Sequence, residues 1–147
     1  TLLGTKHSIV ISELPFLMSY GETEAEEGDA VGMIDKVLVN PTSPMLTWCA
    51  LEMQAVYFSG QSMENDFRVM RGWRGPGFPF PPVQRRPDFR SSGPKRLMPQ
   101  LQIKVPTISR WGKKMAVVVD KAFWESLSAM REVRDVSNSE IAWFVVS

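Results

Sequence analysis

Two strand-like segments joined by a proline-containing turn constrain the fold of this chain more than any other feature. The segments cover residues 31–39 and 46–59, and the turn between them reads Asn-Pro-Thr-Ser-Pro. Two prolines stop a helix and mark a turn, so the sequence predicts an antiparallel hairpin. With the turn centred between Ser43 and Pro44, the hairpin pairs residues whose numbers add up to 87.

This hairpin would bring two acidic side chains together. Asp35 and Glu52 fall opposite each other in the predicted register, about 5 Å apart at Cβ. Carboxylates at that distance repel each other, and Mg²⁺ relieves the repulsion because it binds one or two carboxylates together with water and phosphate oxygens. Gln54 shares a face of its strand with Glu52. Three polar residues within such apolar segments indicate a site.

The rest of the chain predicts an α/β fold. Ser12 can cap a helix that begins near the amino end, and the run Met-Ala-Val-Val-Val is typical of a strand buried on both faces. We expect helices over residues 8–20, 62–73, 95–112 (interrupted by Pro99 and Pro106) and 122–134, and further strands over 115–120 and 140–146. This order predicts a single domain over residues 1–147, with a central mixed β-sheet flanked by helices on both faces.

The charged residues are divided unevenly along the chain. Its 17 basic and 16 acidic side chains give a net charge of +1, but the net charge is −6 in residues 1–60, +9 in 61–114 and −2 in 115–147. Residues 72–99 hold seven of the eleven prolines, so we expect an extended basic loop there. Lysine and arginine neutralise phosphates, and arginine reads guanine in the major groove. The predicted DNA contacts are Arg86, Arg90, Lys95 and Arg96; the alternative is a merely solvated surface.

Residues that occur once exclude several other chemistries. Cys49 alone forms neither an internal disulfide nor a cysteine-based zinc site, and we expect it in the core of a protein of the reducing cytosol. His7 has no second histidine with which to build a metal site and is expected to be exposed. No apolar run reaches the roughly 18 residues of a membrane helix. The chain begins with Thr1, and we expect it to be part of a longer protein.

Two stretches resemble the PD-(D/E)XK nuclease core, in which an Asp on one strand and a Glu-x-Lys on the next hold metal and phosphate. They are GMIDKVL, which contains Asp35, and CALEMQAVYFSG, which contains Glu52. Gln54 stands where the motif has lysine, a variant found in some type II restriction endonucleases. The later segment RRPDFRSSGPKRLMPQLQIKVPTISRWGKKMAVVVDKAFW resembles the NotI-type restriction endonuclease family.

This resemblance implies a restriction-endonuclease-like core that acts as a type II site-specific deoxyribonuclease of a bacterial restriction–modification system. Asp35 and Glu52 would bind Mg²⁺ together with the carbonyl of Met53, and Gln54 would orient the attacking water. Because an amide carries no positive charge, either the metal does more of the work of the missing lysine or a cation assists. Lys36 and Lys104 are both candidates for that cation.

The resemblance also implies a further acid from the preceding helix, for which Glu13 and Glu22 are both candidates. It implies double-stranded DNA as substrate, a homodimer whose two-fold symmetry matches palindromic sites, and a location in the bacterial cytoplasm.

Two other functions are compatible with the sequence. One is a non-catalytic DNA-binding module on the same fold, because Gln54 replaces the lysine. The other is a substrate-binding α/β domain of a larger cytosolic enzyme. In a purely structural reading of the hairpin, Asp35 satisfies a turn and Glu52 pairs with Lys36.

Overall fold

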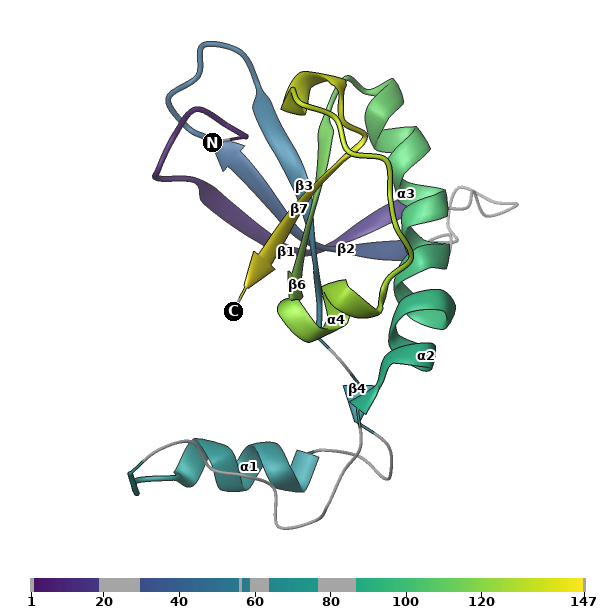
Figure 1. The fold of residues 1–147 in the computed structure, drawn as a ribbon. Helices are drawn as coiled ribbons and strands as arrows, with labels where there is room; N and C mark the ends of the chain where they lie inside the picture. The colour runs from purple at the N-terminus through teal and green to yellow at the C-terminus, as the bar shows by residue number, and fades with distance from the viewer. Residues whose placement is uncertain (1, 19–29, 56, 59–63, 77–86, 147) are drawn as a thin grey trace, which may run out of the picture.

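A five-stranded mixed β-sheet forms the centre of the molecule (Figure 1). The computed structural model describes residues 2–18, 30–55, 57–58, 64–76 and 87–146. In spatial order the strands are β1 (Ile9–Met18), β2 (Ala30–Asn40), β3 (Thr47–Gln54), β6 (Lys114–Asp120) and β7 (Ile141–Val146). The first three are antiparallel neighbours, whereas β6 runs parallel to both β3 and β7. The predicted α/β class with a mixed sheet is confirmed.

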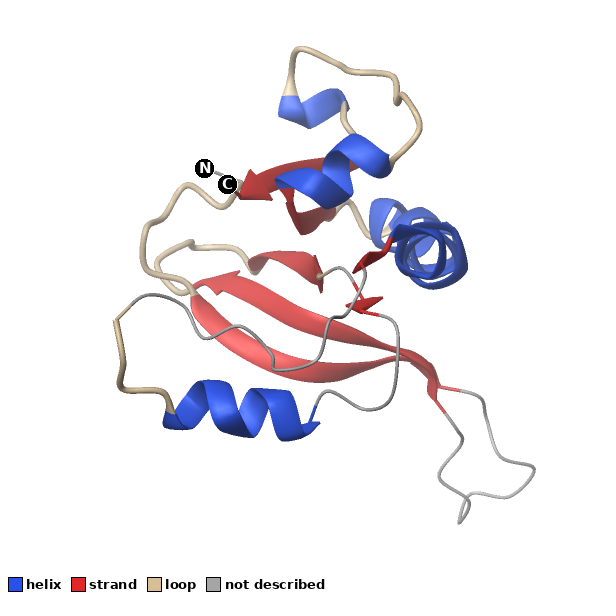
Figure 2. Cartoon of the chain, turned by 60° about the horizontal axis from the view of Figure 1, so that its bottom comes forward, coloured by secondary structure: helices blue, strands red, loops and turns tan. Residues whose placement is uncertain are grey.

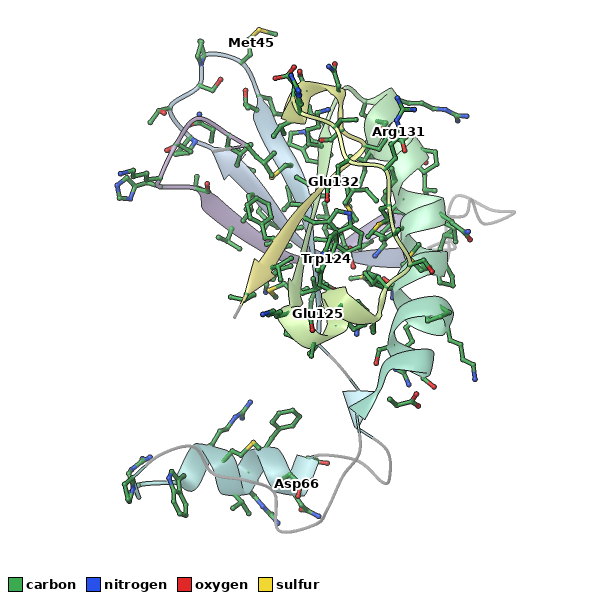
Figure 3. The ribbon with its side chains drawn as sticks, viewed as in Figure 1. Met45, Asp66, Trp124, Glu125, Arg131 and Glu132 are labelled. Atoms are coloured by element: carbon green, nitrogen blue, oxygen red, sulfur yellow. The ribbon has the colours of Figure 1, made fainter. Side chains whose placement is uncertain are left out.

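The other elements lie outside this sheet. They are β4 (Tyr57–Phe58), α1 (Glu64–Gly72), β5 (Pro87–Asp88), α2 (Phe89–Ser92), a π-helix (Gly93–Leu97), α3 (Met98–Arg110), α4 (Lys121–Ser126) and a 3₁₀ helix (Val136–Asn138). The strands β4 and β5 pair with each other in a small separate ladder. Figure 2 views the long helical segment nearly end-on beside the sheet. In Figure 3, Met45 projects from the far tip of the β2–β3 turn.

The helices α3 and α4 cover the same face of the sheet. Val117 and Val119 alternate along β6 and therefore share a face, and both are buried in one cluster with Ile108 of α3 and Phe123 of α4. The prediction of helices on both faces is therefore wrong for these two helices. Along the chain, β3, β6 and β7 are added to the sheet in the same direction. Right-handed crossovers between parallel strands added in this way place their helices on the same face of the sheet.

A strand replaces the helix expected over residues 8–20. The β-branched residues at positions 9–11 favour an extended backbone, and β1 pairs with β2 from Ile9↔Val39 to Met18↔Ala30. Pro15 is tolerated because β1 is an edge strand with one unpaired side. Glu13 has a φ of 54°, in the left-handed region that few residues other than glycine adopt.

Part of the segment expected to be an extended loop is helical instead. The chain is helical without a break from Phe89 to Arg110. Proline has no N–H and interrupts the regular helical bonding, and here Met98 donates its N–H to the carbonyl of Gly93, five residues back. This wider turn is the π-helix that contains Pro94, and α3 then continues through Pro106.

The remaining elements agree with the sequence except in length. The helix predicted over residues 62–73 is confirmed as α1, and the two further strands are confirmed as β6 and β7. The helix predicted over residues 122–134 ends at Ser126, because Leu127 has an extended backbone with a ψ of 151°. Within the described residues, no helix is long and apolar enough to span a bilayer.

Candidate active site

The hairpin register that the turn predicts is confirmed. The pairing of β2 with β3 runs from Asn40↔Thr47 to Lys36↔Leu51, so the paired numbers add up to 87. Asp35 and Glu52 come directly after the last pair. There, Oδ2 of Asp35 accepts a hydrogen bond from the N–H of Met53 at 2.9 Å, and Oε1 of Glu52 faces the N–H of Asp35 at 3.4 Å. Each carboxylate is thus bonded to the backbone of the opposite strand, which brings the two acids together.

The two acids differ in their exposure to solvent. Asp35 is half-buried, whereas Glu52 is only 3% exposed. Burial raises the pKa of the Glu52 carboxyl, and the hydrogen bond and charge of Lys104 offset this rise only in part. The nearby charge of Asp35 makes a smaller upward contribution.

Lys104 of α3 is the cation that lies against the acid pair. Its side chain is buried, and its Nζ lies 2.7 Å from Oε1 of Glu52 and 2.9 Å from Oε1 of Gln100. The Nζ also donates to the carbonyl of Met33. Lys36, by contrast, donates to Oγ of Ser12 at 2.7 Å. Of the two lysines that the sequence left open, the structure places Lys104 at the acids, and the alternative pairing of Glu52 with Lys36 is wrong.

A cleft of about 420 Å³ opens beside Asp35, between β2 and α3. Its volume is typical of a ligand site. The residues that line it include Phe16, Gly32, Met33, Asp35, Gln100 and Lys104. The sequence analysis missed Gln100, although the i,i+4 spacing from Gln100 to Lys104 places both on one side of the helix. The cleft therefore has a carboxylate in its lining, beside a lysine whose ammonium group is bonded to Met33, Glu52 and Gln100.

Gln54 does not contact the acids in this structure. It lies two residues beyond Glu52 on β3, and its Nε2 donates to the carbonyl of Ala55 at 2.6 Å. Side chains two apart in a strand share a face, so Gln54 points to the side of the sheet that carries Glu52. Its amide is nevertheless turned towards its own backbone.

Among the described residues, no third acid joins the pair. Glu13 lies on β1 between Ser12 and Leu14, which pair with Lys36 and Ile34, and its side chain is exposed. No three acidic, histidine or cysteine side chains within the described residues are close enough to hold a metal. The element that carries Glu13 is a strand rather than the expected helix, and Glu22 lies outside the described residues.

The predicted DNA contacts are only partly described. Lys95 and Arg96 are exposed on the π-helix, roughly 12 Å before Lys104 along the same helical run. The pKa of Asp88 is lowered, first by hydrogen bonds from Ser91 and then by the charges of Lys95 and Arg96. Arg86 and the side chain of Arg90 lie outside the described part of the structure.

The expectations for Cys49 and His7 are confirmed. Cys49 is 1% exposed, and burial raises the pKa of its thiol. A buried thiol with a raised pKa is a poor nucleophile. His7 is exposed. Neither residue competes with the acid pair as a centre of chemistry.

The oxygen atoms of the acid pair fit a hard divalent cation. One oxygen of each carboxylate, Oδ1 of Asp35 and Oε2 of Glu52, accepts no hydrogen bond from any described residue. Mg²⁺ prefers carboxylate oxygens and retains several waters, so two such oxygens suffice for a site that a substrate phosphate completes. These two oxygens therefore suit a hard divalent cation as a class.

Comparison with known protein families gives a match over the whole chain. The family profile described as "Restriction endonuclease NotI" matches residues 1–147, the whole chain. No curated protein sequence and no solved structure gives a significant match.

Proposed function

The chain belongs to the NotI restriction endonuclease family, and from this premise we propose that it is a type II site-specific deoxyribonuclease that hydrolyses double-stranded DNA with Mg²⁺. The observation that carries the proposal is the placement of Asp35 and Glu52 side by side, each with one carboxylate oxygen that accepts no hydrogen bond from the described residues. The family match supports the DNA-cleaving activity. The acid pair supports the choice of a hard divalent cation.

In this proposal, Asp35 and Glu52 would hold Mg²⁺ with the carbonyl of Met53. A metal held there would supply positive charge to the scissile phosphate and would lower the pKa of a bound water. The cleft between β2 and α3 receives the phosphate, since Asp35 lines it. Gln54 breaks its hydrogen bond to the carbonyl of Ala55 and orients the attacking water. Only rotation about the side-chain bonds of Gln54 is needed for this movement.

The basic residues position the DNA. Lys95 and Arg96 are exposed on the π-helix of the continuous helical run that carries Lys104, so a phosphate bound there lies on the run that reaches the acids. Arg86 and Arg90 are proposed as further DNA contacts from their position in the sequence alone. We propose that the enzyme acts as a homodimer, because one acid pair cuts one strand and a duplex has two. The proposed location is the bacterial cytoplasm.

The test is cleavage by the complete protein of long duplex DNAs of diverse sequence, with Mg²⁺ and with EDTA. We expect discrete fragments in Mg²⁺ that disappear in EDTA and in Glu52→Gln. The matched control is Glu125→Gln, which removes an exposed carboxylate paired at 3.8 Å with Lys121 and should cut like the wild type. Cleavage by Glu52→Gln at the wild-type rate would refute the assignment of the acid pair.

One observation favours a second candidate, a DNA-binding module without catalysis. The amide of Gln54 bonds to Ala55 rather than to the acids, and Glu52 is bonded to Lys104. DNA binding that persists in EDTA, with no cutting at any Mg²⁺ concentration, would favour this module over the nuclease.

A further inference from the structure

Lys104 is held by acceptors from three different elements. Its ammonium group bonds to the carbonyl of Met33 on β2, to Glu52 on β3 and to Gln100 on α3. A lysine ammonium has three N–H groups, so all of its donors are in use. Lys104 therefore has no donor left for a DNA phosphate while these bonds are kept, and its bond to the acid pair is the one to Glu52.

Both partners of this ion pair are buried. The side chains of Lys104 and Glu52 are 3% and 4% exposed, so water screens their interaction poorly. The acid pair alone carries two negative charges, and Lys104 reduces the local net charge to −1. A carboxylate already neutralised at 2.7 Å attracts a second cation more weakly than a carboxylate without such a partner.

The cleft places a substrate phosphate beside these groups. Asp35 and Lys104 both line it, whereas Glu52 is buried behind the lining. A phosphate in the cleft would add negative charge and oxygen ligands for a metal. Lys104 weakens the attraction of the acid pair for a divalent cation. The negative charge of the substrate phosphate would restore that attraction.

We propose that Lys104 is a positioning residue that limits divalent metal binding to the acid pair in the absence of DNA, so that the metal binds tightly only together with the phosphate. This inference rests on the metal site of the proposed function. It assigns to Lys104 a role in metal loading that the sequence motif does not contain.

The test is titration calorimetry of the full chain with MgCl₂ at pH 8.5 without DNA. The neutral variant Lys104→Met should bind Mg²⁺ at least about tenfold more tightly than the wild type, because one opposing charge is gone. Lys104→Arg keeps the charge and should stay within about twofold of the wild type. A gain in affinity distinguishes this role from a purely structural one, because damage to the site would weaken binding.

Lys36→Met is the matched control. Lys36 is the same residue type and adjoins Asp35 in the chain, but it is bonded to Ser12. It should change Mg²⁺ affinity by less than about twofold, because strand alternation directs it away from Asp35. Equal tightening in Lys36→Met and Lys104→Met would overturn the proposal, since any nearby charge would then suffice.

Circular dichroism shows whether each variant is folded. If Lys104→Met does not fold, Lys104→Gln is used, because a neutral amide still donates to the carbonyl of Met33; the same tightening is expected. A folded neutral variant that binds Mg²⁺ no more tightly than the wild type overturns the inference.

The variant Glu52→Gln separates this inference from the nuclease proposal. Tightening in Lys104→Met that is abolished by adding Glu52→Gln supports the role of Lys104 even if the wild type cuts no DNA. Mg²⁺-dependent cutting by the wild type without any tightening in the neutral variants leaves the nuclease proposal standing and refutes the role of Lys104.

Discussion

Nζ of Lys104 lies 2.7 Å from Oε1 of Glu52, although the two residues are 52 positions apart in the sequence. The contact joins the helix α3 to the strand β3 inside the protein. It also links two features that the sequence suggested separately, the acidic hairpin and the basic helical segment.

Removing only one partner of the ion pair between Lys104 and Glu52 should destabilise the protein. Lys104→Met leaves Glu52 buried with no opposing charge and should reduce the free energy of unfolding by about 3 kcal/mol in urea. The double variant Lys104→Met/Glu52→Gln removes both charges and should recover most of that loss. A double variant less stable than Lys104→Met would contradict the paired role of the two side chains.

The stability of the protein should depend on pH through Glu52. Burial raises the pKa of this carboxyl in the folded state above its ordinary value of 4.5, so the folded protein binds the proton more tightly than the unfolded chain. The protonated Glu52 carboxyl therefore stabilises the folded state. This stabilisation is complete below the unfolded-state pKa and is lost as pH rises through the folded-state pKa.

Thermal melts in EDTA measure this effect. As pH rises from 4.5, the wild type should lose stability relative to Glu52→Gln, whose side chain does not titrate but still accepts from Lys104. The two melting temperatures could instead differ by a constant amount across this range, or the difference could change in the opposite direction. Either result would show that burial does not raise the pKa of Glu52.

The start of α4 depends on one capping side chain. Oδ1 of Asp120 accepts from the N–H of Phe123 at 2.8 Å. Asp120→Ala should lower the free energy of unfolding by about 1 kcal/mol, and Asp120→Asn by less, because asparagine also caps helices. DNA cutting at low temperature should be unchanged, since α4 carries none of the site residues. Equal losses in the two variants would argue against the cap.

Lys95 should contribute to DNA affinity in a salt-dependent way. If it contacts one phosphate, Lys95→Ala lowers the slope of log affinity against log salt by about 0.9. The control is Lys121→Ala, which removes an exposed lysine of α4 and should leave the slope unchanged. Fluorescence anisotropy with a duplex in EDTA gives both slopes, and a slope that Lys95→Ala leaves intact removes Lys95 from the interface.

Local features were predictable from the sequence, and distant contacts were not. The turn at Ser43 and Pro44 determined the register of the hairpin, and so the placement of Asp35 beside Glu52. The choice between Lys36 and Lys104 could not be made, because Lys104 reaches Glu52 only after α3 has packed on the sheet.

The errors in secondary structure have a related cause. Residues 8–20 combine apolar residues with a capping serine, which suits a helix, but β1 gains its pairing with β2 and so becomes a strand. The extended loop predicted over residues 72–99 included Pro94, because proline disrupts a regular α-helix. The π-turn accommodates Pro94, and a single sequence carries no clear signal for that geometry.

Asp35 is much closer to Glu52 in the sequence than Lys104 is, and this difference sets the order in which the three side chains meet during folding. Asp35 and Glu52 are 17 residues apart in one hairpin, and hairpins form in microseconds. Lys104 arrives with the parallel crossover from β3 to β6, and such non-local pairing is slower. The two carboxylates therefore meet before their lysine does, and their repulsion opposes an early step of folding. Salt, by screening that repulsion, should speed the refolding of this chain.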